Sequence, residues 1–306
     1  MKICVIGCGA IGSLFAAHLA RLEDVEVYAY DLNRDHVDAI NEKGLRISGE
    51  ADFTAQLQAT TDPAQIPRCD FGLVVTKSMH TGDAIRAARG IFDEDSAVCS
   101  VQNGAGNEEV LAEYVHHVIL GTTFPAGHLV EAGHVCFDIR GDTWIGPFQP
   151  SGTPFDKVER LAEALTRAGL KTLAMQDARS AQWTKLVFNA STNPVGALTQ
   201  LHHGAATFFE PTGDLFDQLI DECLAVAEAM GIELDEDPRH LIQKAAQAAG
   251  KHKASMLQDI LARRPTEVDF LNGAIVRYGE KAGVPTPLNR VLWKLIKGLE
   301  HSWTDP

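Results

Sequence analysis

The chain has 306 residues, of which 45% are hydrophobic and 22% are charged, and its formal net charge is −14. This length allows two domains, and the apolar fraction allows a sizeable core without disulfides. The negative charge would repel nucleic-acid phosphates, and no apolar run reaches membrane-spanning length. We therefore expect neither a nucleic acid nor a membrane as partner, and we expect a cytoplasmic protein.

The six cysteines show neither a CxxC pair nor zinc-ribbon spacing. Several fall in predicted buried strands, where cysteine is an ordinary small apolar residue. The histidine pairs 116–117 and 202–203 lack the i, i+4 spacing of a helical metal pair. The sequence therefore predicts a reduced protein without a metal.

The first stretch of the chain has the pattern of a dinucleotide-binding turn. A β-branched run over 3–6 predicts a buried strand, and an apolar-periodic helix begins after the glycines. Between them, Gly7 permits a tight turn, Gly9 permits close approach of a pyrophosphate, and Gly12 permits close helix packing. The free N–H groups of the helix would face the phosphates. The predicted cofactor-binding residues of this turn are Gly7, Cys8, Gly9, Ala10, Ile11 and Gly12.

A second strand over 25–30 ends at Asp31, nineteen residues after Gly12. An acidic side chain at this place accepts hydrogen bonds from the ribose hydroxyls, and it repels a 2′-phosphate. The local chemistry therefore favours NADH over NADPH. Arg34 follows closely and is able to pair with a phosphate, and Asp31 has the alternative role of a helix or turn cap.

The remainder of residues 1–175 alternates strands with helices, which predicts an α/β, doubly wound parallel sheet of the Rossmann type. A hairpin is expected over 134–145, with its turn at Gly141–Asp142. The other predicted elements are a helix over 34–43, strands over 45–49, 53–60, 71–76, 96–101 and 118–120, and a helix over 107–114.

Two further polar residues follow predicted strands of this domain. Lys77 comes directly after the strand over 71–76, and Asn103 follows the strand over 96–101. Ligands of such sheets bind beyond the carboxyl ends of the strands. Each residue alone has an ordinary explanation, a solvated lysine or a tight turn. Because they share one sheet edge with the glycine turn, we expect both to bind the cofactor.

Residues 176–306 form the second predicted domain, which is all helical. Lys185, Asn189 and Asn193 recur every four residues and therefore line one stripe of a helix that Pro194 ends or kinks. One cation and two amides are costly to bury without partners. Glu267 falls in the first turn of another helix, where a helix-dipole role is the better explanation from the residues alone. The predicted helices cover 178–193, 215–230, 238–249, 255–262, 266–282 and 289–299.

The whole chain resembles the ketopantoate reductase (2-dehydropantoate 2-reductase) family. The family reduces ketopantoate to pantoate with NAD(P)H on the route to pantothenate, and it joins a Rossmann domain to a helical domain like the C-terminal one of 6-phosphogluconate dehydrogenase. The segments that carry the resemblance are Gly7–Gly12, Val75–Ser78, Gln102–Gly106, Trp183–Asn189, Thr192–Pro194, Ser255–Ile260 and Thr266–Gly273.

The resemblance implies a role for each polar residue of the helical half. Lys185 would be the general acid that protonates the forming alkoxide, and Glu267 would hold a substrate hydroxyl. Asn189, Asn193 and Ser255 would bind the substrate. This agrees with the residue chemistry, since hydride attack on a ketone builds negative charge on oxygen, which an ammonium stabilises.

Two departures from the family pattern keep alternatives open. Tyr30-Asp31-Leu32 replaces the usual basic residue after the second strand, which favours NADH. His202-His203 replaces a stretch that often offers an asparagine to the substrate. An NAD-dependent D-2-hydroxyacid dehydrogenase for another branched or aromatic 2-oxo acid is therefore the main alternative. A dinucleotide-binding sensor is a second alternative, and a homodimer is left open.

Overall fold

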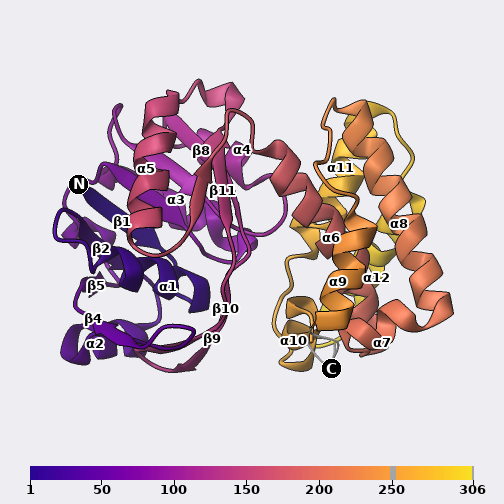
Figure 1. Ribbon diagram of the computed structural model, residues 1–306, viewed down its shortest axis with the longest axis horizontal. Coiled ribbons are helices and arrows are strands. Elements are labelled where there is room, and N and C mark those ends of the chain that lie inside the picture. Colours follow the sequence, from indigo (N-terminus) through magenta and orange to yellow (C-terminus); the bar gives the residue numbers. More distant parts are fainter. Residues whose placement is uncertain (249–252, 305–306) are drawn as a thin grey trace. The chain divides into compact units, whose positions relative to one another are not determined.

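The computed structural model describes residues 1–248 and 253–304, which divide into two compact units (Figure 1). The first unit comprises Met1–Gln102 and Asn107–Ala178. The second comprises the short loop Asn103–Gly106 and the described residues from Arg179 onward. The predicted doubly wound sheet followed by a helical half is confirmed.

The first unit is built on an eight-stranded sheet in the order β12-β11-β8-β7-β6-β1-β2-β5. Six strands run parallel from β8 to β5, whereas β11 runs antiparallel to β8 and carries β12 parallel to itself. The strands are β1 (Lys2–Ile6), β2 (Glu26–Tyr30), β5 (Gln58–Thr60), β6 (Phe71–Val74), β7 (Ala97–Ser100), β8 (His117–Thr123), β11 (Thr143–Pro147) and β12 (Thr172–Ala174).

Helices cover both faces of this sheet, which is why its central strands are apolar throughout rather than alternating. Ile3 and Val5 pack into one core with α1 and α5, whereas Cys4 and Ile6 pack into another with α3 and α4. The helices of this unit are α1 (Ala10–Leu19), α2 (Arg34–Lys43), α3 (Thr81–Ala88), α4 (Asn107–Ala112) and α5 (Phe155–Arg167).

A second, four-stranded sheet in the order β4-β3-β10-β9 packs one face against α1. Its strands are β3 (Leu45–Gly49), β4 (Phe53–Ala55), β9 (Ala126–Glu131) and β10 (His134–Ile139). Val135 and Phe137 of β10 point into the core, so the alternate side chains of that strand lie on the opposite face.

Two strand predictions are wrong in this region. The single strand expected over 53–60 is divided between β4 and β5, which belong to different sheets. The hairpin expected over 134–145 does not form, because β10 pairs with β9 and β11 pairs with β8. The reason is that β9 buries none of its side chains fully, so no hydrophobic pattern marks it as the partner of β10.

The second unit consists of helices packed around the long helix α6 (Figure 1). Leu186, Val187 and Ala190 of α6 are almost completely buried in its core. Helix α7 of this unit and helices α3 and α5 of the first unit were not predicted. The helices of this unit are α6 (Arg179–Thr199), α7 (His203–Phe208), α8 (Glu210–Ala229), α9 (Pro238–Ala248), α10 (Ser255–Leu261), α11 (Asn272–Ala282) and α12 (Pro287–His301).

Two predicted helix boundaries differ from the structure, and a third lies outside the described residues. Helix α6 continues through Pro194 to Thr199 rather than ending there. The helix expected over 266–282 is a 3-10 turn (Val268–Phe270) followed by α11, because Leu271, with ψ −98°, interrupts it. Ala249, the predicted last residue of the helix over 238–249, lies outside the described residues.

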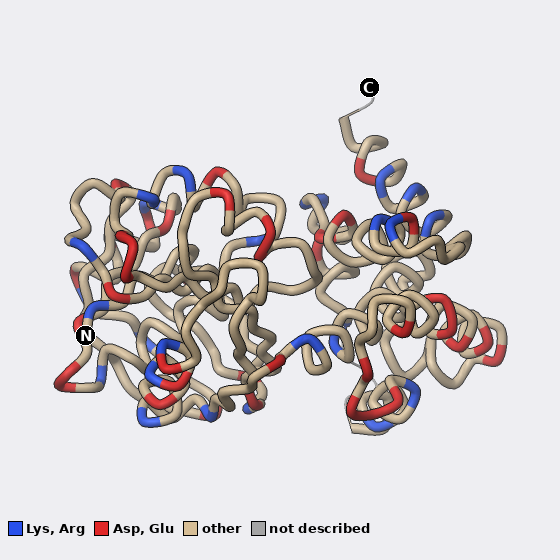
Figure 2. Tube along the Cα trace, turned by 90° about the horizontal axis from the view of Figure 1, so that it is seen from above, with Lys and Arg blue, Asp and Glu red and all other residues tan. Residues whose placement is uncertain are grey.

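Both units carry short segments of Lys and Arg and short segments of Asp and Glu, separated by uncharged residues (Figure 2). Among the described residues, no helix combines the length and the apolar character needed to cross a bilayer.

Candidate active site

The glycine turn connects β1 to α1 in a geometry that requires glycine at two of its three glycine positions. Gly7 has φ +89°, and a Cβ there would lie 2.6–2.9 Å from atoms of Thr76. A Cβ on Gly12 would lie 1.9 Å from the carbonyl oxygen of Gly7. Gly9 differs, because it is exposed and no described atom lies within 4 Å of the position of its Cβ. Two glycines are therefore needed for packing, and the third leaves open space above the backbone.

That open space lies at the N-terminus of α1, where backbone N–H groups have no partners within the helix. Gly9 is the N-cap residue and has no side chain to cap them. An anion is favoured at such a helix end by these donors and by the helix dipole. The turn therefore fits the pyrophosphate of a dinucleotide, as the sequence predicts.

The backbone of Cys8 is fixed on both sides of the turn. Its N–H donates to Asp31 Oδ2 at 2.6 Å, and its carbonyl accepts a hydrogen bond from Ser13 Oγ at 2.9 Å. Asp31 Oδ1 also accepts from the Asn33 N–H at 2.8 Å. The Asp31 carboxylate is thus held beside the glycine turn, at the end of β2. The contact made by Ser13 was not predicted, because this residue lies inside a helix of ordinary composition.

Lys77 is exposed and follows β6, the strand that pairs with β1. The neighbouring strand end is tied to this region by Gln102, whose Nε2 donates to the Thr76 carbonyl at 2.9 Å and to Thr81 Oγ1 at 2.8 Å. Gln102 was not predicted to act at the site, although it directly precedes Asn103. It positions the ends of β6 and β7.

In the second unit, Lys185 is partly buried on α6 and lies beside Glu267. Burial lowers the pKa of Lys185 to about 8, and the negative charge of Glu267 acts in the opposite direction. An amine with such a pKa is able to release a proton near neutral pH, which a surface lysine cannot do efficiently.

Glu267 is 7% exposed and accepts a hydrogen bond at Oε2 from Asn103 Nδ2, at 3.1 Å. The structure thus brings Asn103, Glu267 and Lys185 together in the helical unit. Because the helix predicted over 266–282 is interrupted, Glu267 precedes a 3-10 turn rather than occupying the first turn of a long helix. The helix-dipole explanation for this carboxylate therefore does not apply in the form predicted.

The interruption of this helix leaves a backbone carbonyl available to the loop Asn103–Gly106. The carbonyl of Phe270, the last residue of the 3-10 turn, accepts a hydrogen bond from the Ala105 N–H at 3.0 Å. Gly104 has φ +84°, and a Cβ there would lie 2.2 Å from the same carbonyl oxygen. The Phe270 carbonyl therefore anchors the loop that presents Asn103 to Glu267.

Helix α12 fixes the segment that carries Glu267. Glu300 accepts hydrogen bonds from the backbone N–H and the hydroxyl of Thr266, at 2.8 and 2.7 Å. Trp293 Nε1 donates to Asp269 Oδ1 at 2.6 Å on the other side of Glu267. The sequence carries no signal for these contacts, because they join residues far apart in the chain.

Asn189 and Asn193 lie one and two turns after Lys185 on α6, and both are at most 9% exposed. The helix continues past Pro194, which removes the N–H that would bond the carbonyl of Ala190. That carbonyl is taken up by Asn272 Nδ2 at 2.8 Å, and Asn272 is fully buried. This contact explains why Pro194 does not end the helix.

Ser255, the remaining predicted substrate ligand, is the exposed first residue of α10. Helix α10 packs against α6. The predicted site residues thus form two groups, one with the glycine turn in the first unit and one on α6 and its neighbours in the second.

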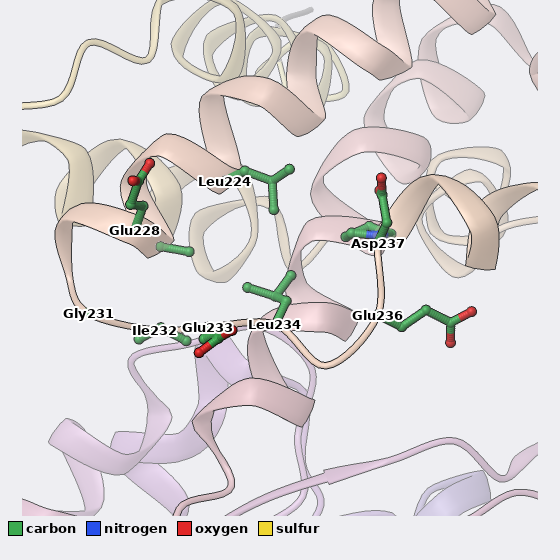
Figure 3. Close-up of a pocket in the computed structure, with 10 residues that line it drawn as sticks. Leu224, Glu228, Gly231, Ile232, Glu233, Leu234, Glu236 and Asp237 are labelled. Carbon is green, nitrogen blue, oxygen red and sulfur yellow. The ribbon is translucent and has the colours of Figure 1, made fainter.

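A surface hollow of about 620 Å³ between α8 and α9 contains none of these residues. Leu224 and Leu234 point toward each other across it (Figure 3). Its four carboxylates would repel an anionic 2-oxo acid, so we do not assign the substrate to it. These carboxylates belong to Glu228, Glu233, Glu236 and Asp237.

Comparison with known families gives two matches that together cover most of the chain. The sequence profile described as Ketopantoate reductase PanE/ApbA matches residues 3–150, and the profile of its C-terminal part matches residues 177–300. The 2-dehydropantoate 2-reductase of Pyrococcus abyssi is 37% identical over 98% of both chains.

Two solved structures are similar over 99% of both chains. One is a PanE/ApbA family ketopantoate reductase from Ralstonia eutropha, with 31% identity and a TM-score of 0.90. The other is D-mandelate dehydrogenase in a ternary structure with NADH and anilino(oxo)acetate, with 25% identity and a TM-score of 0.90.

Proposed function

Because the chain belongs to the ketopantoate reductase family, we propose that it is a 2-dehydropantoate 2-reductase. It reduces the keto group of ketopantoate to the hydroxyl of pantoate, in pantothenate biosynthesis. The observation that carries this proposal is the partly buried Lys185 beside Glu267, on a helix whose next two turns present Asn189 and Asn193.

The chemistry follows from charge development at the ketone. When bound, NAD(P)H supplies the hydride that the carbonyl carbon accepts. Negative charge then develops on the oxygen, where the Lys185 ammonium stabilises it and donates a proton. Glu267 holds a substrate hydroxyl, and its charge keeps Lys185 protonated despite burial. Asn189, Asn193 and Ser255 bind the rest of the substrate.

Residues of the first unit, together with Asn103 of the loop that is grouped with the helices, hold the cofactor. The N–H groups at the start of α1 within Gly7–Gly12 bind the pyrophosphate, since those of Gly7 and Cys8 already donate to Tyr30 and Asp31. Lys77 and Asn103 complete the cofactor site. The cofactor is a nicotinamide dinucleotide, and we propose that the protein prefers NADH to NADPH. Each Asp31 oxygen accepts one backbone N–H and retains a lone pair for a ribose hydroxyl. The same carboxylate would repel a 2′-phosphate.

A specific observation supports the alternative of a D-2-hydroxyacid dehydrogenase for another 2-oxo acid. D-mandelate dehydrogenase, solved with NADH, is similar over nearly the whole chain. An aromatic 2-oxo acid is therefore the competing substrate.

Steady-state assays with NADH and NADPH separate these possibilities. We expect the highest kcat/KM with ketopantoate, compared with phenylglyoxylate and 2-ketoisocaproate. A higher value with phenylglyoxylate would favour the D-2-hydroxyacid dehydrogenase. Cofactor binding without turnover of any 2-oxo acid would favour a sensor and refute the reductase.

A further inference from the structure

The smaller sheet of the first unit carries three metal-ligating side chains on the face opposite its core. His128 lies on β9, and Cys136 and Asp138 lie on β10. One imidazole nitrogen, the thiol sulfur and one carboxylate oxygen all lie within 4.8 Å of one another. Val135 and Phe137 occupy the alternate, buried positions of β10, so the three ligand-bearing side chains are outside the core.

Strand register and one irregularity bring the three side chains together. His128 is directly opposite Cys136 in the antiparallel pair. The register shifts between Phe137 and Ile139, which leaves Asp138 without an opposite residue. Such bulges re-aim a side chain. Here the Asp138 carboxylate reaches the imidazole of His128, with 2.8 Å between Oδ2 and Nδ1.

The surroundings leave the sulfur accessible. Cys136 is partly exposed, whereas the other five cysteines are at most 2% exposed. Gly49 of the neighbouring strand β3 lies beside Cys136, and a Cβ on Gly49 would lie 3.0 Å from Cys136 Sγ. A larger residue would therefore crowd the thiol that the glycine leaves open.

We propose that His128, Cys136 and Asp138 bind a divalent transition metal ion of the Zn²⁺ type, with solvent as the fourth ligand. A mixed nitrogen, sulfur and oxygen set suits Zn²⁺ or Co²⁺, whereas Mg²⁺ and Ca²⁺ prefer oxygen alone. On binding, Sγ bonds to the metal and the thiol proton passes to solvent.

Binding requires the three side chains to rearrange, because Cys136 Sγ, at up to 4.8 Å from the other ligand atoms, has to approach them by up to about 1 Å. In a tetrahedral site, a ligating nitrogen and oxygen lie about 3.3 Å apart. The His128 and Asp138 atoms, now hydrogen-bonded at 2.8 Å, need to separate by roughly half an ångström. The sequence prediction of no metal considered helical pairs and CxxC spacing, and neither pattern detects ligands that meet across two strands.

Cobalt titration of the reduced, untagged, full-length chain tests the proposal. We expect one equivalent of Co²⁺ to produce a thiolate-to-cobalt charge-transfer band, which Zn²⁺ then removes by displacement. Because the other five thiols are buried, such a band reports on Cys136. Absence of the band in the folded wild-type protein would overturn the proposal.

Variants assign the ligands. C136S should abolish the band, and H128A and D138N should each weaken Co²⁺ binding more than about tenfold. The matched control is H134A, since His134 lies on the same face of β10 and bonds Ser48 Oγ at 2.8 Å but is outside the ligand set. Wild-type affinity in H128A or D138N, or an equal loss in H134A, would refute the three-residue site. D138N nearly preserves side-chain shape, so it remains informative if C136S fails to fold.

Discussion

A single lysine on α6 has the environment expected of a proton donor. Burial lowers the pKa of Lys185 to about 8, and Glu267 limits that decrease. The ammonium form still predominates at neutral pH, so the residue is charged when the ketone is reduced and close to the pKa at which transfer is efficient.

Replacing Lys185 by alanine should lower kcat/KM for the 2-oxo acid by about 10²–10⁴-fold, which is the usual contribution of a positioned proton donor. Steady-state kinetics measure the loss, and circular dichroism and cofactor binding should remain those of the wild type. An activity within a factor of a few of wild type would exclude Lys185 as the general acid.

The pH dependence of reduction should follow the same amine. Activity requires the protonated form, so kcat should fall as the pH rises through about 8. In E267Q the raising charge is lost, and the fall should begin at lower pH. K77A is the control, because it should change the KM of the cofactor without moving the pH at which kcat declines. An unchanged profile in E267Q would contradict the electrostatic role of Glu267.

Asp31 combines a structural bond with a charge, and D31N separates the two. The amide oxygen still accepts the Cys8 N–H, and the repulsion of a 2′-phosphate disappears, although the bond from the Asn33 N–H is lost because an amide has one acceptor oxygen. We expect the ratio of kcat/KM with NADH to that with NADPH to fall about tenfold. A constant ratio would show that Asp31 does not select the cofactor.

At the level of elements, helix α6 keeps its polar stripe continuous because Asn272 compensates for Pro194. Without Asn272 Nδ2, the Ala190 carbonyl would be buried with no N–H from residue 194. Asn272 also donates to Asn289 Oδ1 at 2.9 Å, and Asn289 in turn donates to Glu222 Oε2. One amide chain thereby connects α6, α11, α12 and α8.

A double-mutant cycle isolates this compensation. N272A should destabilise the protein by about 1–3 kcal/mol, because it leaves a buried acceptor unbonded. In the P194A background the alanine N–H bonds Ala190, so the same change should cost about 1 kcal/mol less. Urea unfolding gives the four free energies. Strict additivity would mean that Asn272 does not serve the proline.

Much of this fold could be predicted from local patterns, because apolar β-branched runs and helical periodicity depend on nearby residues. The predictions that were wrong concern elements whose structure depends on contacts with residues far away in the chain. No hydrophobic pattern marks β9 as a strand, so the predicted pairing of β10 was wrong. The break before α11 lies at Leu271, beside a Phe270 carbonyl that accepts the N–H of the distant residue Ala105. Lys185, Glu267 and Asn103 were identified as polar residues of recognisable segments, but their mutual placement requires the fold.

At the scale of the whole molecule, two buried histidines of the first unit make the free energy of unfolding depend on pH. Gly133 N–H donates to His36 Nδ1 at 3.0 Å, so His36 is neutral and its Nε2–H donates to Ser13 Oγ. His18 donates from Nδ1 to the Ala168 carbonyl, and its buried Nε2 has no partner within the described chain. Burial is the main cause that lowers the pKa of both side chains.

A lowered histidine pKa means that the unfolded chain binds protons before the folded one does. Stability should therefore be complete above about pH 6.5 and should fall as the pH decreases below that value. Thermal unfolding between pH 7.5 and 5 measures this, and H36Q should flatten the dependence while lowering Tm at pH 7.5. A Tm that rises on acidification, or the same slope in H36Q, would contradict the assignment.

The loop Asn103–Gly106 is grouped with the helices of the second unit, although the residues on both sides of it belong to the first unit. Since the Phe270 carbonyl anchors it, no single cut between residues 178 and 179 yields two self-contained pieces. A chimera that grafts a foreign helical half onto this sheet would inherit the strand ends intact and lose the anchor that presents Asn103. A working exchange of the helical half therefore has to carry the loop Asn103–Gly106 together with its anchor.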